Sequence, residues 1–159
     1  MKKYADVSNC GKYRYSLKRI WDEDKPLVAF IGLNPSTADA IDDDSTITRC
    51  INFAKSWGAG GLYMLNIFAY RATSPVDMME QEEPIGPEND YYLTHLPDIE
   101  KVIVCWGNNG THRGRSSEVI SILRETLKKD LFCLDVNKTG EPKHPLYVQG
   151  LAKPKLYKY

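Results

Sequence analysis

The most constraining feature of this chain is a short apolar run that stops at a turn. Leu27 to Gly32 carries only apolar side chains, which is typical of a short buried strand. Leu33-Asn34-Pro35-Ser36 follows directly and ends the strand. Ligands of open α/β sheets bind beyond the carboxyl ends of the strands. The segment therefore predicts a buried strand with an amide side chain at its tip.

Apolar strand-like segments alternate with helical-period segments along the rest of the chain. The pattern predicts strands at about 12–20, 27–32, 62–68, 102–106 and 131–136, and helices at about 43–58, 90–96 and 116–128. Residues 71–89 are rich in proline and glutamate, and we expect them to be irregular. The alternation predicts one domain over residues 1–159, an α/β fold with three α/β/α layers and a central, mostly parallel sheet.

Net charge, cysteine spacing and the length of the apolar runs bear on whether the chain binds nucleic acid, a metal or a membrane. The 159 residues carry no net charge, so no overall field draws the chain to nucleic acid or an acidic membrane, and nucleic-acid binding would need a local patch. The four cysteines have no metal-ligand spacing, so we expect no metal and no cofactor. No apolar run has the length of a membrane span, and no signal-peptide segment is visible at the start. We expect a cytoplasmic monomer.

Four predicted loops carry polar residues that belong at one edge of the sheet. They contain Asn34 with Ser36, Asn66 with Arg71, Asn108, and His144. Because the carboxyl ends of parallel strands share an edge, we expect these loops to converge on one site. Simpler interpretations stay open: a turn and helix cap for Asn34 and Ser36, a satisfied buried amide for Asn66, and a loop histidine for His144.

The acidic run Asp42-Asp43-Asp44 indicates a helix start, where negatively charged carboxylates interact favourably with the helix dipole.

Three segments, in order, resemble the motifs of the uracil-DNA glycosylase superfamily. Gly32-Leu33-Asn34-Pro35-Ser36 is similar to the first motif, and the stretch from Asn66 to Pro75 is similar to a segment of the iron–sulfur branch. His144-Pro145-Leu146-Tyr147 is similar to the final motif. A closer resemblance, over nearly the whole chain, is to a bacterial and phage group called the domain of unknown function 1643 family. Its hallmarks resemble the segments 33–39, 44–46, 86–90 and 144–147.

The resemblance implies a uracil-DNA glycosylase-like fold and a DNA repair activity, hydrolysis of the N-glycosidic bond to a pyrimidine-like base. Asn34 and His144 would be catalytic, with neutral His144 donating a hydrogen bond to the departing base. The small Ser36 would leave room for a base substituted at the 5-position. The resemblance further implies base-binding roles for Asn66, Phe68, Ser36 and Tyr70, and DNA contacts from Arg71, Asn108, Lys143, Leu146, Tyr147, Lys153 and Lys155.

Two alternatives use the same residues. The first is an enzyme acting on a free nucleoside or nucleotide, with the same site and no grip on DNA. The second is a binding module for a nucleotide or nucleic acid that keeps the pocket without the chemistry. The zero net charge favours these alternatives, whereas the segment around His144 and the lysines of the carboxyl-terminal end favour a DNA glycosylase.

Overall fold

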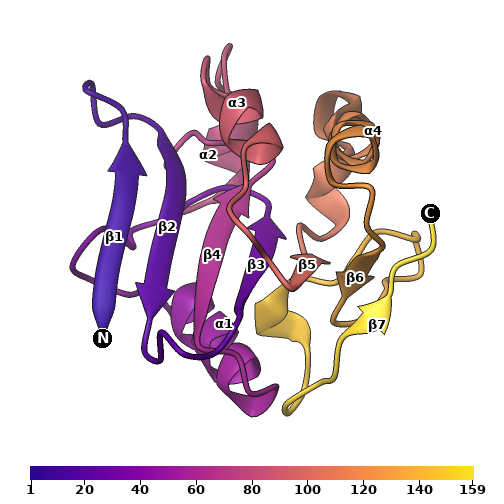
Figure 1. The fold of residues 1–159 in the computed structure, drawn as a ribbon. Coiled ribbons are helices and arrows are strands. Elements are labelled where there is room, and N and C mark those ends of the chain that lie inside the picture. Colours follow the sequence, from indigo (N-terminus) through magenta and orange to yellow (C-terminus); the bar gives the residue numbers. More distant parts are fainter.

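The computed structural model describes all residues from 1 to 159 and contains one seven-stranded sheet with helices on both faces (Figure 1). The strand order is β1-β2-β4-β3-β5-β6-β7. The strands are β1 (Lys2–Val7), β2 (Arg14–Ile20), β3 (Leu27–Gly32), β4 (Gly61–Asn66), β5 (Lys101–Val104), β6 (Leu131–Cys133) and β7 (Lys155–Leu156). The chain is thus an α/β protein.

The centre of the sheet is parallel and its edges are antiparallel. Strands β4, β3, β5 and β6 run side by side in one direction, whereas β2 pairs antiparallel with both β1 and β4, and β7 pairs antiparallel with β6. The parallel register sets Gly32 opposite Asn66 at the ends of β3 and β4. The carboxyl ends of the central strands therefore point to one edge of the molecule.

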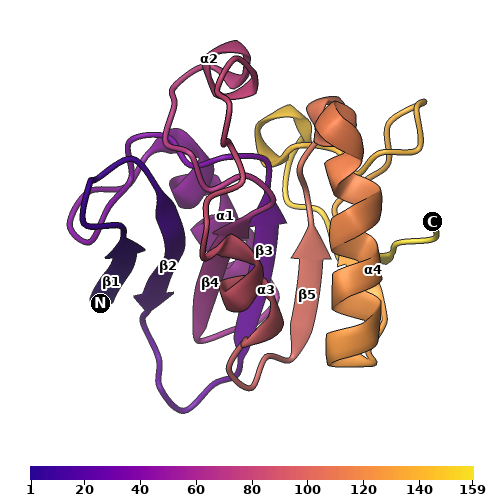
Figure 2. The same cartoon turned by 90° about the horizontal axis from the view of Figure 1, so that it is seen from above.

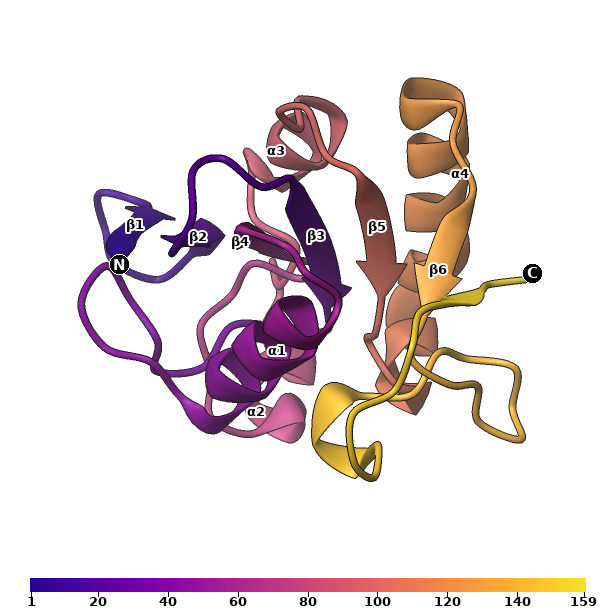
Figure 3. The ribbon, with the colours of Figure 1, turned by 60° about the horizontal axis from the view of Figure 1, so that its bottom comes forward.

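The helices form two layers around this sheet. Helix α1 (Ser45–Ser56) covers one face, and α3 (Asn89–Thr94) and α4 (Arg115–Leu127) cover the other (Figures 2 and 3). The five-residue α2 (Pro75–Met79) lies beyond the strand ends (Figure 2). Two short 3-10 helices, η1 (Asn108–Gly114) and η2 (Pro145–Tyr147), complete the fold.

Strand β3 shows why the central strand is wholly apolar. Val28 and Phe30 belong to the core cluster on the α1 face, whereas Ala29 and Ile31 belong to the cluster on the opposite face. Side chains alternate between the two faces of a strand, so a strand covered on both sides needs apolar residues at every position. The aromatic ring of Phe30 stacks on Trp57 at the end of α1, with ring centroids 5.7 Å apart.

The predicted start and end of α1 are confirmed. Asp44 is the N-cap, and its Oδ1 accepts a hydrogen bond from the Ile47 amide at 2.9 Å. This bond satisfies one of the backbone donors that the first turn leaves free. The helix ends at Ser56, followed by Trp57 and by Gly58 with a positive φ of 79°.

The prediction of the sheet was incomplete at its edges. Strands β1 and β7 were not predicted, because nearly all their residues are exposed and carry no clear apolar alternation, and backbone pairing alone defines them. The strand expected at 131–136 stops at Cys133. Helix α2 lies in the segment expected to be irregular. It begins with a Ser74 cap and a proline at its first position.

No helix is long and apolar enough to cross a membrane.

The packing of β3 gives a first prediction. Phe30 has no exposed surface, so Phe30→Ala removes a ring from the core beneath α1 and should lower the free energy of unfolding by about 3–5 kcal/mol. Val76→Ala is the control: this side chain is largely exposed and should change stability by less than about 0.5 kcal/mol. Urea unfolding measures both, and equal effects would contradict the assigned core.

Candidate functional site

A cavity of about 820 Å³ lies beyond the carboxyl ends of the central strands. This volume is within the range of small-molecule sites. The loops after β3, β4 and β5, the first turn of α1 and the segment leading into η2 form its walls, and α1 and η2 lie close together (Figure 3). It is lined by Leu33, Asn34, Ser36, Thr37, Asp44, Ser45, Thr46, Ala72, Thr73, Pro75, Trp106, Gly107, Asn108, Asn109, Asn137, Lys143, His144, Leu146 and Tyr147.

A second, much smaller chamber of about 30 Å³ adjoins this cavity. Both are lined by Leu33, Asn34, Ser36, Asp44, Thr46 and His144. Among the residues that line the chamber but not the cavity are Arg14 and Asn66, both almost fully buried. The site thus has a wide outer part and a polar inner part, which are separated by shared side chains.

His144 has a defined proton position. Its Nδ1 accepts a hydrogen bond from the Leu146 amide at 3.2 Å, so in the neutral ring the proton is on Nε2. Nε2 has no hydrogen-bond partner in the protein, and the ring lines both the cavity and the chamber. Burial lowers the pKa of His144, and the nearby Asp44 carboxylate opposes this shift. The ring is therefore a neutral hydrogen-bond donor at neutral pH.

Arg49 of α1 holds the backbone around His144 in place. Its guanidinium donates hydrogen bonds to the carbonyls of Val148, Gly150 and Pro145, and it lies over the Phe53 ring. These bonds attach η2 to α1. The site thus depends on a contact between residues about 100 positions apart in the sequence.

Asn34 joins two of the loops. Its Nδ2 donates to the Ala72 carbonyl at 2.9 Å, and the Ala72 amide donates back to the Pro35 carbonyl at 3.0 Å. The loops after β3 and β4 are therefore fastened to each other. The Oδ1 of Asn34 accepts no hydrogen bond within the protein, which leaves it free to accept one from a ligand.

Asn66 is the last residue of β4 and is only 2% exposed. Neither its Oδ1 nor its Nδ2 has a hydrogen-bond partner in the protein. Its backbone is fixed from behind, because buried Asn89 donates to the carbonyls of Asn66 and Ile67 and buried Arg115 also donates to Ile67. Asn66 thus presents an unpartnered side-chain amide at the wall of the chamber, on a backbone that is fixed from behind.

The structure brings most of the sequence-predicted residues together. Asn34, Ser36, Asn108, Lys143, His144, Leu146 and Tyr147 line the cavity, and Asn66 lines the adjoining chamber. Leu146 and Tyr147 are largely exposed. Asn108 uses its Oδ1 to accept hydrogen bonds from Asn137 and Thr139, so it also fixes the loop before His144.

Other predicted residues lie elsewhere. Phe68 is completely buried in the core on the α3 and α4 face, so its ring is not available to stack on a ligand in the cavity. Tyr70 packs edge-on against Tyr13, and Arg71 reaches the Gly11 carbonyl. Neither lines the cavity.

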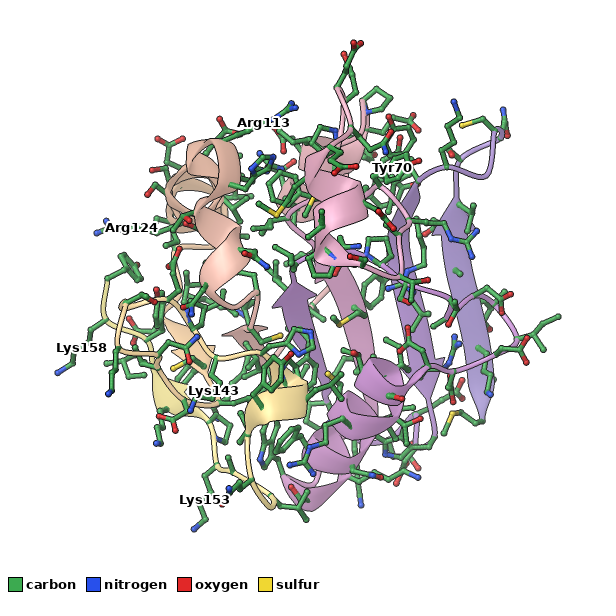
Figure 4. The ribbon with its side chains drawn as sticks, turned by 180° about the vertical axis from the view of Figure 1, so that it is seen from behind. Tyr70, Arg113, Arg124, Lys143, Lys153 and Lys158 are labelled. Carbon is green, nitrogen blue, oxygen red and sulfur yellow. The ribbon has the colours of Figure 1, made fainter.

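The carboxyl-terminal lysines do not form one patch. Lys143 lines the cavity, whereas Lys153 lines a separate groove next to Trp57. Lys155 is paired with Asp135 at 3.3 Å. Figure 4 shows Lys153 and Lys158 projecting outward, apart from Lys143. The basic surface expected from their closeness in sequence is therefore dispersed by the turn into β7.

Sequence reasoning missed two contributors. Asp44 was expected only to start a helix, yet it lines both parts of the site. Trp106 follows β5 and lines the cavity, with Gly110 so close that a Cβ there would lie 2.1 Å from the ring. The resemblance of the segment 44–46 to a family hallmark was the available signal for Asp44.

No three His, Cys, Asp or Glu side chains are grouped to hold a metal ion.

The partly buried His144 ring predicts a pH dependence of stability. Because its pKa is lowered in the folded state, the unfolded chain takes up the proton first as the pH falls below about 6.5. Wild type should therefore lose stability relative to His144→Gln as the pH falls through this window. Urea unfolding at a series of pH values measures the difference, and a constant difference would contradict the lowered pKa of His144 in the folded state.

The Asn34–Ala72 hydrogen bond gives a second prediction for the site. In Asn34→Asp a carboxylate that cannot donate would face the Ala72 carbonyl, which should cost about 1–3 kcal/mol of stability. Asn109→Asp introduces the same charge at the same cavity, but its exposed side chain makes no hydrogen bond. Thermal unfolding should show a clear loss for the first variant and little change for the second.

Comparison with known proteins adds a family but no activity. The family model described as "Protein of unknown function (DUF1643)" matches residues 14–146, from β2 to η2. Neither a curated protein nor a solved structure gave a match. The match covers well over half of the chain and includes every residue that lines the cavity except Tyr147. The chain therefore belongs to the DUF1643 family.

Proposed function

We propose that this protein hydrolyses the N-glycosidic bond of a pyrimidine-like base, with a fold of the uracil-DNA glycosylase type. The observation that carries the proposal is the shared position of His144 and Asn34. They come from segments 110 residues apart, yet they line one cavity and offer it a donor at Nε2 and an acceptor at Oδ1. The motif resemblance of these two segments supports the same activity.

The chemistry requires stabilisation of two developing charges. As the C1′–N bond breaks, negative charge builds on the base and positive charge builds on the sugar. A fixed donor aimed at a base oxygen stabilises the first, and its effect is greater in the transition state than in the ground state. His144 suits this role because its ring is neutral and its Nδ1 is held by the Leu146 amide.

The cavity wall is compatible with a base that carries an extra group. Ser36, rather than a bulky residue, follows Pro35 and lines the cavity. Trp106 supplies an aromatic wall, and Tyr147, which is 77% exposed, stands at the cavity with its ring 5.8 Å from that of His144. Aromatic groups of this kind support a base that has left the stack.

A second candidate substrate is a free nucleoside or nucleotide. The dispersal of the lysines favours it, because only Lys143 among the carboxyl-terminal lysines lines the cavity and Lys155 is already paired. Tight binding to DNA needs several phosphate contacts. A free nucleotide needs only one charged contact, which Lys143 can make.

One assay separates these possibilities. The protein is incubated with a panel of single- and double-stranded oligonucleotides that contain uracil, thymine or 5-substituted pyrimidines, and in parallel with the matching nucleosides and nucleotides. Released base is measured by chromatography, and abasic sites by alkaline cleavage. Release from DNA alone supports the glycosylase, and release from free nucleotides alone supports the second candidate. Binding without release from any substrate would contradict both and leave a binding module.

His144→Ala tests the donor. On the best substrate of this panel, the single-turnover rate should fall by about 100-fold or more, because one donor to a developing anion contributes on that scale. Substrate binding should change far less. His95→Ala is the control, since His95 is exposed at the end of α3 and lines neither the cavity nor the chamber. Equal rates for the two variants would contradict the role of His144.

A further inference from the structure

The inner chamber combines buried polar groups that have no partner in the protein. Asn66 has both a free donor and a free acceptor, and the Nε of Arg14 is also free. Arg14 is held at its other end, where Nη1 donates to the Ala38 carbonyl at 2.9 Å. Burial lowers the pKa of Arg14, but only to about 10, so the guanidinium is charged at neutral pH. The chamber wall therefore offers at least two unpartnered donors and one unpartnered acceptor.

Buried polar groups of this kind are satisfied by ordered water in folded proteins. A chamber of about 30 Å³ is large enough for a water molecule, which needs roughly 10–15 Å³ by the same measure and two to four polar partners. It is far too small for a nucleobase. Its size and its lining together select water as the occupant.

Asp44 is the one carboxylate at the chamber, and it lies on the cavity side as well. Its Oδ1 is held by the Ile47 amide at 2.9 Å, whereas Oδ2 has only a long contact of 3.4 Å with the Ala38 amide. Oδ2 thus has spare capacity to accept a proton. The amide of Asn34, which lines the same two spaces, has no such capacity.

We propose that the chamber binds the water molecule that attacks the sugar, and that Asp44 is the catalytic residue that takes its proton. This inference rests on the proposed function. The water oxygen forms a bond to C1′ while the C1′–N bond breaks. The electron pair of that bond goes to the base nitrogen, where His144 stabilises the charge through a base oxygen, and the proton of the water goes to Oδ2 of Asp44.

The chamber lies where a stored water molecule could attack a sugar bound in the cavity. It adjoins the cavity through His144, Asn34 and Asp44, so a sugar seated in the cavity would close the chamber and bring C1′ next to the stored water. Arg14 Nε donates to one lone pair of the water oxygen, Asn66 Oδ1 accepts one hydrogen and Asp44 accepts the other, so the second lone pair faces C1′. A nucleophile held in this way contributes through proximity and general base catalysis.

The first experiment needs no substrate. A crystal structure of the wild-type protein at about 1.5 Å resolution should show water within hydrogen-bond distance of Asn66 and Arg14. Asn66→Leu should fold, because an apolar residue of similar size replaces an amide that has no protein partner, and it should lack this water. A dry chamber in the wild type would overturn the proposal.

The second experiment tests the proton acceptor. Asn is as good an N-cap as Asp, so Asp44→Asn keeps α1 while removing the base. The single-turnover rate should fall by roughly 100- to 10,000-fold, with substrate binding little changed. Asp42→Asn is the matched control: it removes one charge from the same acidic run, but its exposed side chain lines neither space.

The outcomes are distinct. If the wild type releases base and Asp44→Asn keeps a rate within threefold of Asp42→Asn, the role of Asp44 is overturned while the proposed function stands. If the wild type releases no base, the proposed function fails and the nucleophilic role of the water fails with it. Loss of rate confined to Asp44→Asn and Asn66→Leu supports the proposal.

Discussion

The site depends on the hydrogen bonding between β3 and β4 continuing past the ends of both strands. The Ile67 and Phe68 amides donate to the carbonyls of Gly32 and Leu33, at 2.9 Å each. Farther out, Ala72 exchanges hydrogen bonds with the Pro35 carbonyl and the Asn34 amide. A parallel pair normally separates at its end, but here the two loops stay joined. This continuity sets Asn34 and Asn66 at one edge of the sheet.

Three buried arginines then fix the loops that surround this edge. Arg14 holds the Ala38 carbonyl, Arg19 pairs with Asp43 and holds the 39–42 turn, and Arg115 holds the Ile67 carbonyl. Each guanidinium has several donors in a rigid plane, so it can satisfy backbone carbonyls that the loops leave unpaired. Polar groups that hold the backbone, rather than apolar packing, therefore shape the wall of the site.

The site itself was predictable in part, and the reason differs from residue to residue. Asn34 and His144 were predicted because each directly precedes a proline in a motif that resembles a known one, and both line the cavity. Phe68 was predicted to stack on a base because it is an aromatic residue in the motif-like segment that begins at Asn66, but it is buried in the core. Distance along the chain does not determine the face on which a side chain emerges once a strand has ended. Asp44 was predicted only to mark a helix start, a local role that does not reveal what lies across from it.

The sequence by itself determined the α/β class, β3 and the limits of α1, because apolar periodicity and capping residues act over a few positions. Only the tertiary structure decided that the edge strands β1 and β7 join the sheet, that the lysines disperse, and that Asp44, Asn66 and Arg14 meet around one chamber. These outcomes depend on contacts between distant segments, such as the bonds from Arg49 to the residues around η2. Local propensity carries no information about such contacts, because their free energy appears only when the chain is folded.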